Sequence, residues 1–491
     1  MTLLAAVVLP LVVGAWLATA ARQIGPRVAW GAALLASLTS LCLVGAGLVR
    51  GDVFRWTWVE SLGIDLALGA DGISTPLLVL TAVIGVLVVL LARAYVPEGG
   101  SAAAYLGCVL VASGGALATF AARDAIVFFL AFELVLIPVW ALIHRYGDPT
   151  DEAARRDAGL RFVLFTVTGS ILMLVGILTL VSAAGTSDLD ELVTAGAALP
   201  LRTQTIIALL LCAGLAVKVP LFPAHTWLPA AHTIAPTGGS VILAAVLLKM
   251  GTYGLVRLPL ASVPDGFARV APLLAILAAI GIVWGGLVCL VEPELKRLIA
   301  YSSIAHMGFV VLGLASGTVA GVQAALIGNI AHGIISATLF IVVGGLKQRW
   351  GKVRLDGPLP ALREHAPRLG FVLILALAAA LGLPGLAGFW GEIFAIYGAW
   401  VSQLGPGLLL KVCAGVAALG AVLAAGYALR VAHALWVGAA PAPVPPTGPS
   451  ETVGVERLSL SVLVVAIVAL GLAPHLVWSL TLADVLVVMG R

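Results

Sequence analysis

Apolar stretches long enough to cross a lipid bilayer recur along the whole chain, from Leu3 to Met489. Of the 491 residues, 61% are hydrophobic and only 10% are charged, a composition that excludes an ordinary soluble globular protein. The first run, from Leu3 to Ala21, lacks a basic leading segment, so it is typical of a first membrane helix rather than of a cleaved signal peptide. We therefore expect an all-α polytopic membrane protein.

A membrane-spanning helix needs about 20 apolar residues, and this length divides the chain into about 14 predicted spans. They lie near residues 2–21, 28–49, 72–95, 102–121, 124–144, 159–183, 204–219 (broken, continuing past 226), 239–260, 270–291, 300–317, 321–346, 370–402 (broken), 408–437 and 458–485. The connection 438–457 contains APAPVPPTGPS, a Pro-rich sequence typical of an extended linker.

Arginine and lysine are divided unequally between alternate connections, with 17 in one set and 7 in the other. The positive-inside rule places the richer set, which includes Arg145, Lys347 and Arg354, in the cytoplasm. Both termini are then expected outside, as an even number of spans requires.

The segment 218–250 contains the most unusual pattern, KVPLFPAHTWLPAAHTIAPTGGSVILAAVLLKM. Lys218 ends one apolar run and Lys249 lies near the end of the next, and four prolines lie between them. Proline removes a backbone donor and clashes with the preceding turn, so the helix that carries Lys218 must break just after it. Such a break survives in hydrocarbon only where protein or water satisfies the backbone. The two lysines beside it indicate a site that moves charge, although lysines that extend to the membrane surface would explain them more simply.

A second break is predicted in GLPGLAGFWGE, residues 382–392, just before Glu392. The two breaks lie in the seventh and twelfth predicted spans, so the two halves would have opposite orientation, as in the inverted repeats of secondary transporters. We expect two five-helix repeats, each with a broken helix. The predicted divisions are three N-terminal spans (1–101), the first repeat (102–261), the second repeat (262–437), and the linker with the last span (438–491).

Titratable residues inside the spans form a series across both repeats, and each is a candidate for proton transfer. A lone buried histidine is just as well explained as a structural hydrogen-bonder, but the series as a whole favours a proton relay. We expect Lys218 to partner Glu133, and we expect His225 and His232, near the first break, to help proton uptake or only to shape the motif. The candidate relay residues are Glu133, Lys218, Lys249, His306, His332 and Glu392.

Redox chemistry is not expected on this chain. The five cysteines are scattered singly, without metal or redox-motif spacing, and no dinucleotide or phosphate-binding motif is present. Moving one charge against about 100 mV costs roughly 2.3 kcal/mol, so a partner or an ion gradient must supply the energy.

The run from Lys218 to Arg257, together with YSSIAHMG, NIAHG and GFWGE, resembles the subunit M (chain 4) family of bacterial NADH-quinone oxidoreductase, respiratory complex I. The resemblance covers nearly the whole chain. It implies that Glu133 is the family's essential glutamate, that Lys218 is the broken-helix lysine and that Lys249 is the connecting lysine. It also implies that His306 and His332 are the family's relay histidines and that Glu392 is the exit residue.

The resemblance further implies a proton-pumping subunit in the bacterial plasma membrane, next to other antiporter-like subunits. Flavin, iron-sulfur clusters and quinone are then expected on partner subunits, and none on this chain. Related subunits generally carry lysine at the exit position, so Glu392 favours subunit M. The alternatives are a subunit of an Mrp-type cation/proton antiporter or of a membrane-bound hydrogenase, and a passive scaffold in a membrane complex.

Overall fold

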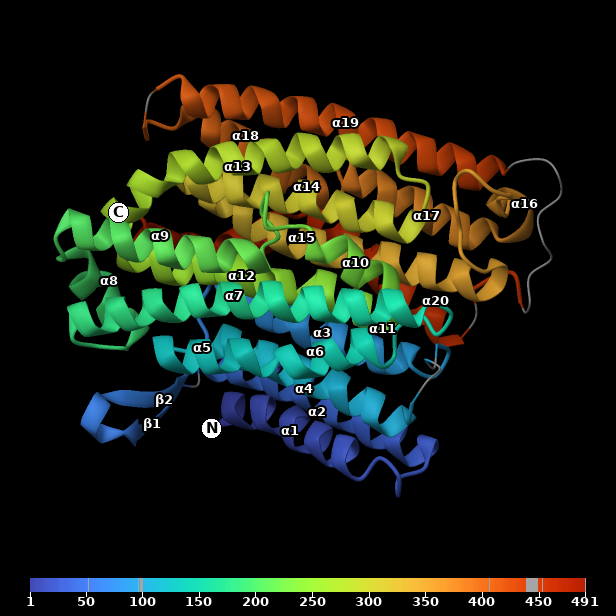
Figure 1. Ribbon diagram of the computed structural model, residues 1–491, viewed down its shortest axis with the longest axis horizontal. Coiled ribbons are helices and arrows are strands. Elements are labelled where there is room, and N and C mark those ends of the chain that lie inside the picture. The colour runs from blue at the N-terminus through green and yellow to red at the C-terminus, as the bar shows by residue number, and fades with distance from the viewer. Residues whose placement is uncertain are drawn as a thin grey trace.

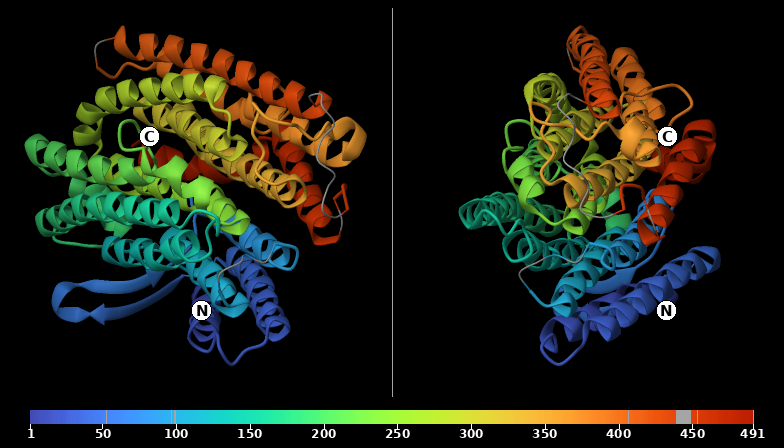
Figure 2. Two further views of the ribbon diagram at one scale, coloured as in Figure 1. Left: turned by 45° about the vertical axis from the view of Figure 1, so that its right-hand side comes forward. Right: turned by 90° about the vertical axis from the view of Figure 1, so that its right-hand side faces the viewer.

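The apolar runs fold into helices that lie side by side along one common direction (Figure 1). The computed structural model describes residues 1–51, 53–95, 97, 100–405, 407–438, 449–452 and 454–490. The helices α1 and α2 lie along one long side of the bundle and α19 lies along the opposite side (Figures 1 and 2).

The first part of the chain supplies the helices that surround the first break. Their bounds are α1 Thr2–Thr19, α2 Pro26–Arg50, α3 Thr75–Leu91, α4 Ala102–Ala121, α5 Ala125–Leu134, α6 Leu136–His144, α7 Glu152–Ala184, α8 Leu189–Ala197, α9 Leu201–Lys218, α10 Trp227–Ile234, α11 Thr237–Ile242, the π-helical η2 Leu243–Leu247, α12 Leu248–Leu255 and the π-helical η3 Val256–Leu260.

The second part supplies the helices that surround the second break. Their bounds are α13 Pro264–Val291, α14 Leu295–Ala315, α15 Val319–Trp350, α16 Leu362–His365, α17 Pro367–Ala380, α18 Gly388–Val401, α19 Leu409–Val437, α20 Gly454–Leu472 and α21 His475–Val488.

Twelve helices in the described part of the chain are long and apolar enough to cross a membrane, and α3, α17 and α21 are shorter apolar helices. The prediction of a mostly helical, multi-pass membrane protein is therefore confirmed. The count of about 14 spans, the inverted repeats and the divisions at 101, 261 and 437 stay predictions. The predicted Pro-rich linker lies largely outside the described residues.

The most enclosed helices form the centre of the bundle. The apolar windows of α15 and of the continuous segment Thr237–Leu260 are 94% buried and that of α14 is 89% buried, compared with 33% for α1 and α2. A helix that is apolar on all sides is buried on all sides. Polar side chains on these central helices are therefore kept away from lipid.

Both predicted helix breaks are confirmed. The first separates α9 from α10, and the carbonyl of Val217 at the end of α9 accepts a hydrogen bond from Trp227 Nε1 at 3.0 Å. The second separates α17, which ends at Ala380, from α18. Each break thus leaves backbone groups that only protein or water can satisfy at this depth.

The last predicted span, 458–485, is wrong as a continuous helix. The chain is interrupted between α20 and α21, where Pro474 cannot donate the backbone bond that would continue the helix. The carbonyl of Gly471 near this interruption accepts a hydrogen bond from Trp390 Nε1 at 2.7 Å.

The connection between α2 and α3 forms a β-hairpin, which the apolar pattern of the sequence does not predict. Its strands are β1 Phe54–Val59 and β2 Ile64–Leu68, joined by the short 3-10 helix η1 Glu60–Leu62. The strands pair antiparallel, Phe54 opposite Leu68, with a bulge between Thr57 and Val59. The hairpin lies at the same end of the bundle as both chain ends (Figure 1).

Candidate functional site

Lys249 and His332 form the closest contact between titratable side chains in the centre of the bundle. Lys249 Nζ lies 2.5 Å from His332 Nδ1 and donates to the carbonyl of Ala244 at 2.6 Å. Ala244 lies in the π-helical η2, one turn before Lys249, and π-helical turns are frequent at functional sites. Lys249 is completely buried, so its charge has only these partners and any water to stabilise it.

His332 continues the polar contacts along α15. Its Nε2 lies 3.1 Å from the hydroxyl of Ser336, one turn further on. A neutral imidazole accepts at one nitrogen and donates at the other. His332 can therefore accept from Lys249 and donate to Ser336 at the same time.

His306 on α14 lies beside His332, with the ring centroids 5.7 Å apart. Its Nδ1 is 2.6 Å from the carbonyl of Ser302, and its Nε2 is 2.6 Å from the carbonyl of Ala380, where α17 ends. A neutral ring has one N–H and can donate to only one of these carbonyls, whereas the imidazolium can donate to both. The carbonyl of Ala380 at the second helix break therefore stabilises the protonated form of His306.

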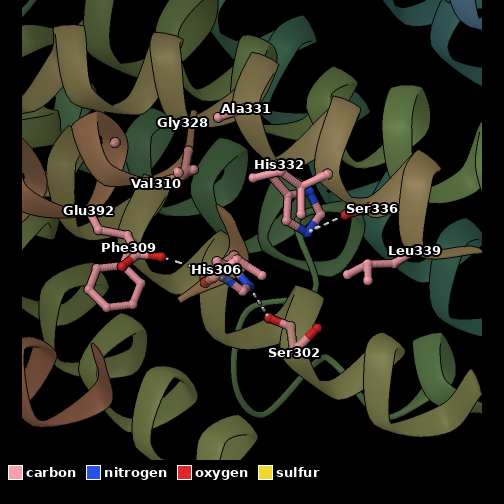
Figure 3. A pocket seen from close by; sticks show the side chains of 14 residues that line it. Ser302, His306, Phe309, Val310, Gly328, Ala331, His332, Ser336, Leu339 and Glu392 are labelled. Atoms are coloured by element: carbon pink, nitrogen blue, oxygen red, sulfur yellow. Dashed lines mark hydrogen bonds and ion pairs between the residues drawn. The ribbon is translucent and has the colours of Figure 1, made fainter. Parts of the chain in front are cut away.

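Glu392 follows His306 on the other side. Its Oε1 lies 3.4 Å from His306 Nε2, and the carboxyl is buried (Figure 3). The α18 backbone comes close to α15 here, since a Cβ on Gly391 would lie 2.7 Å from the Cα of Gly328. Glycine at this crossing is what lets α18 present Glu392 to the histidines.

A small cavity lies between His306, His332 and Glu392. It is lined by His306, His332, Ser336, Ser302 and Glu392 among others, and it holds about 30 Å³ for the centres of water molecules (Figure 3). That volume has room for roughly two waters. Lys249, His332, His306 and Glu392 thus form a row of titratable side chains. This row can pass protons through direct contacts and one short water bridge.

Lys218 lies apart from this row. Its Nζ is buried without a hydrogen-bond partner among the described residues and lies 4.8 Å from the ring of Phe132. No hydrogen bond or ion pair joins Lys218 to Glu133 in the described contacts, so their expected partnership stays a prediction. Glu133 instead accepts a hydrogen bond from Ser170, and it acts on Lys218 only through space. The helix break fixes the position of Lys218, but the side chain is left to water or to a moving partner.

The two candidate uptake histidines lie in the segment between α9 and α11. His225 is stacked on Phe222 and is 5% exposed, and its Nδ1 has no partner in the described part of the chain. His232 on α10 is completely buried and stacked on Phe340, with a centroid distance of 4.5 Å. Both histidines stay candidates for proton uptake. In the described contacts, neither of them directly contacts Lys249 or His332.

Charged side chains at the hairpin end of the bundle form a network of ion pairs that does not include the candidate relay residues. Asp71 pairs with both Arg123 and Arg257, and Arg123 also pairs with Asp190. Burial alone would raise the pKa of Asp71, but Arg257, Ser74 and Arg123 together hold that pKa well below its usual range. Asp124 does not pair with Arg123 in the described contacts but caps α5 through the backbone N–H groups of Ile126 and Val127.

Several polar residues of the site were missed by the sequence reasoning. Ser302 precedes His306 by four residues and Ser336 follows His332 by four, so each hydroxyl-bearing residue lies one helical turn from a candidate histidine. That spacing is visible in the sequence and could have identified them. Ser170, which binds Glu133 from α7, carries no comparable sequence signal.

Comparison with known proteins matches residues 122–418 to the family model described as NADH:quinone oxidoreductase/Mrp antiporter, TM. NADH-quinone oxidoreductase subunit M of Rickettsia typhi is 33% identical over 390 residues, which cover 79% of this chain and 75% of the relative.

Two solved structures share the fold. A chain of respiratory complex I from Thermus thermophilus superposes with a TM-score of 0.88 at 29% identity and covers 100% of this chain and 99% of its own length. A chain of the Mrp complex from Dietzia sp. superposes with a TM-score of 0.87 at 24% identity, over 100% of this chain and 52% of the other. The second likeness concerns the fold alone.

Proposed function

The chain belongs to the NADH:quinone oxidoreductase/Mrp antiporter transmembrane family, and from that membership we propose that it is the proton-translocating, antiporter-like subunit M of an NADH-quinone oxidoreductase. It moves protons from the cytoplasm to the outside of a bacterial plasma membrane, with both termini outside. The relay consists of Glu133, Lys218, Lys249, His306, His332 and Glu392.

One observation carries this proposal. Lys249, His332 and Glu392 are buried and His306 is partly buried, and the four lie in a row, with separations of 2.5 Å from Lys249 to His332 and 3.4 Å from His306 to Glu392. Intramembrane ionisable groups are expensive to bury, and they mark pathways for ions and protons by default. A row of four that crosses the enclosed centre of the bundle has no comparable explanation in packing.

The proton steps follow from the chemistry of the row. A proton on Lys249 passes to His332 Nδ1, because the two nitrogens already share one contact. Water in the cavity carries it to His306, which gains a second carbonyl bond when protonated. Glu392 then accepts it as the exit group. Lys218 loads Lys249 through water, and Glu133 sets the charge balance around Lys218.

The driving energy comes from elsewhere. NADH oxidation and quinone reduction take place on partner subunits, which we expect to carry the flavin, the iron-sulfur clusters and the quinone. This chain lies in the membrane arm beside other antiporter-like subunits, embedded in the bilayer, and carries out no redox step itself.

A Lys218→Ala variant tests the proposal against a passive scaffold. In membrane vesicles that hold the assembled complex, proton pumping per NADH oxidised should fall at least tenfold while the complex remains assembled. Intact pumping by the assembled variant would favour the scaffold.

The Mrp antiporter is the second candidate function, because the description of the matching family model includes both the oxidoreductase and the Mrp antiporter. The named sequence relative at 33% identity favours the oxidoreductase. Purification in mild detergent separates the two: a flavin that travels with the chain supports the oxidoreductase, and small antiporter subunits without flavin support the alternative.

A further inference from the structure

His232 is a buried histidine whose ring nitrogens have no hydrogen-bond partner among the described residues. Its side chain is 0% exposed. Buried polar atoms are nearly always hydrogen-bonded, to protein or to ordered water. These two nitrogens without protein partners therefore favour a position that water reaches.

One side of His232 faces the charged end of the bundle. Lys296, in the first turn of α14, donates to the carbonyl of Ala235 at the end of α10, three residues after His232. The backbone N–H of Asp148 bonds the neighbouring carbonyl of Ile234 at 2.9 Å, and the Asp148 carboxylate pairs with Lys347 at 2.9 Å. The end of α10 therefore connects the buried His232 with the charged residues Lys296, Asp148 and Lys347.

The other side of His232 faces the Lys249–His332 pair. The ring is stacked on Phe340 of α15. Ser336, which bonds His332, lies one turn before Phe340 on the same helix, about 6 Å along the axis. Both Lys296 and Lys249 lie close enough to the His232 ring to act on it electrostatically.

We propose that Lys296 and His232 form an input limb that delivers protons to the Lys249–His332 pair from the end of the bundle that carries Asp148. The inference rests on the proposed function and adds Lys296 as a new member of the pathway. Full pumping then needs this limb as well as Lys218.

The steps balance without any further reactant. The Lys296 ammonium releases a proton through water to one ring nitrogen of His232, and the imidazolium releases a proton from its other nitrogen through water toward Ser336 and His332. Lys296 then regains a proton from bulk water near Asp148. A purely structural Lys296 would only cap the last carbonyls of α10, as lysine near a helix C-terminus commonly does.

Arginine separates these two roles, because it keeps the charge and the donors of lysine but does not release its proton in proteins. Lys296→Arg and Lys296→Ala should both lower proton pumping per NADH oxidised at least tenfold in vesicles that hold the assembled complex. The matched control Lys352→Arg, at a half-exposed lysine that pairs with Asp148 at 3.2 Å, should pump as the unmodified protein does. Pumping at the unmodified level by Lys296→Arg would overturn the proposal and leave Lys296 as a cap.

His232→Phe provides an independent test, because phenylalanine keeps the stack on Phe340 and removes both nitrogens. It should also lower pumping at least tenfold without loss of assembly, and unchanged pumping would overturn the input limb. The Lys249→Ala variant separates a failure of the proposed function from a failure of the input limb. If Lys249→Ala pumps normally, the proposed function itself fails, whereas loss in Lys249→Ala with normal pumping in both Lys296→Arg and His232→Phe rejects only the input limb.

Discussion

Lys249 of α12 and His332 of α15 place two titratable nitrogens 2.5 Å apart in a completely enclosed part of the bundle. Two positive charges at this distance repel strongly in a medium of low dielectric constant, so the pair favours holding one proton over two. A proton that arrives at Lys249 therefore promotes transfer to His332 and onward. The Lys249–His332 pair therefore suits the transfer of one proton at a time from Lys249 to His332.

The buried ammonium of Lys218 should destabilise the folded subunit. Its Nζ has no hydrogen-bond partner in the described contacts, and an unpaired buried polar group costs about 1–3 kcal/mol by protein mutational data. Lys218→Met should therefore raise or preserve the temperature at which the subunit leaves the purified complex, while pumping is lost. The exposed Lys411→Met serves as the control and should change neither quantity. A lower dissociation temperature for Lys218→Met would show that water or a partner stabilises the charge.

The contact between Gly382 and Glu392 should be needed for the exit step. A Cβ on Gly382 would lie 2.5 Å from Glu392 Oε2, and φ of Gly382 is +73°. Gly382→Ala should lower pumping nearly as much as Glu392→Gln, because the carboxyl must move away from His306.

Gly385→Ala is the matched control for that experiment. Gly385 also has a positive φ of +89°, but a Cβ there would meet only Leu472, at 3.9 Å. It carries a similar backbone penalty of about 1–2 kcal/mol without displacing Glu392, so it should pump normally. Equal loss of pumping in both variants would assign the effect to backbone strain.

The ion pairs at the hairpin end should differ widely in their importance. Asp71 and Arg257 have side chains only 16% and 11% exposed, and breaking a buried pair costs about 3–5 kcal/mol. Arg55 of the hairpin is 47% exposed, and a surface pair contributes about 0–1 kcal/mol. Asp71→Asn should thus lower the thermal stability of the subunit far more than Arg55→Ala does, as measured by retention in the complex after heating. Similar losses would contradict this ranking.

The helix breaks and the buried titratable residues could be predicted from the sequence. Pro220 cannot continue a helix, whatever surrounds it, and Glu392 inside an apolar run must face protein or water, because lipid cannot solvate it. Both arguments depend on local chemistry alone, so they needed no knowledge of packing.

The contacts of each side chain could not be predicted. Neighbouring positions on a helix point about 100° apart, so a small change in rotation decides whether Glu133 meets Lys218 or Ser170. The sequence likewise does not indicate that Lys296, in the first turn of α14, bonds the end of α10. The hairpin was missed because an extended, partly exposed pair of strands leaves only a weak pattern.

The Asp148 carboxylate, between α6 and α7, should contribute stability that does not vary near neutral pH. Burial alone would raise its pKa, but Thr150 and Lys347 hold that pKa well below its usual range. A depressed pKa stabilises the folded state fully above the unfolded value of about 3.9 and loses this contribution as the pH falls further. Asp148→Asn should therefore lower the thermal midpoint equally at pH 6 and pH 8, with a smaller difference only below about pH 4. A difference that changes between pH 6 and pH 8 would assign the effect to another group.

The most direct measurement is the ratio of protons pumped to NADH oxidised by vesicles that hold the assembled complex with Lys249→Ala. The substitution removes the nitrogen that contacts His332 and leaves His306 and Glu392 in place. If Lys249 carries protons to His332, the ratio falls at least tenfold compared with the unmodified complex. A ratio equal to that of the unmodified complex would contradict this role of Lys249.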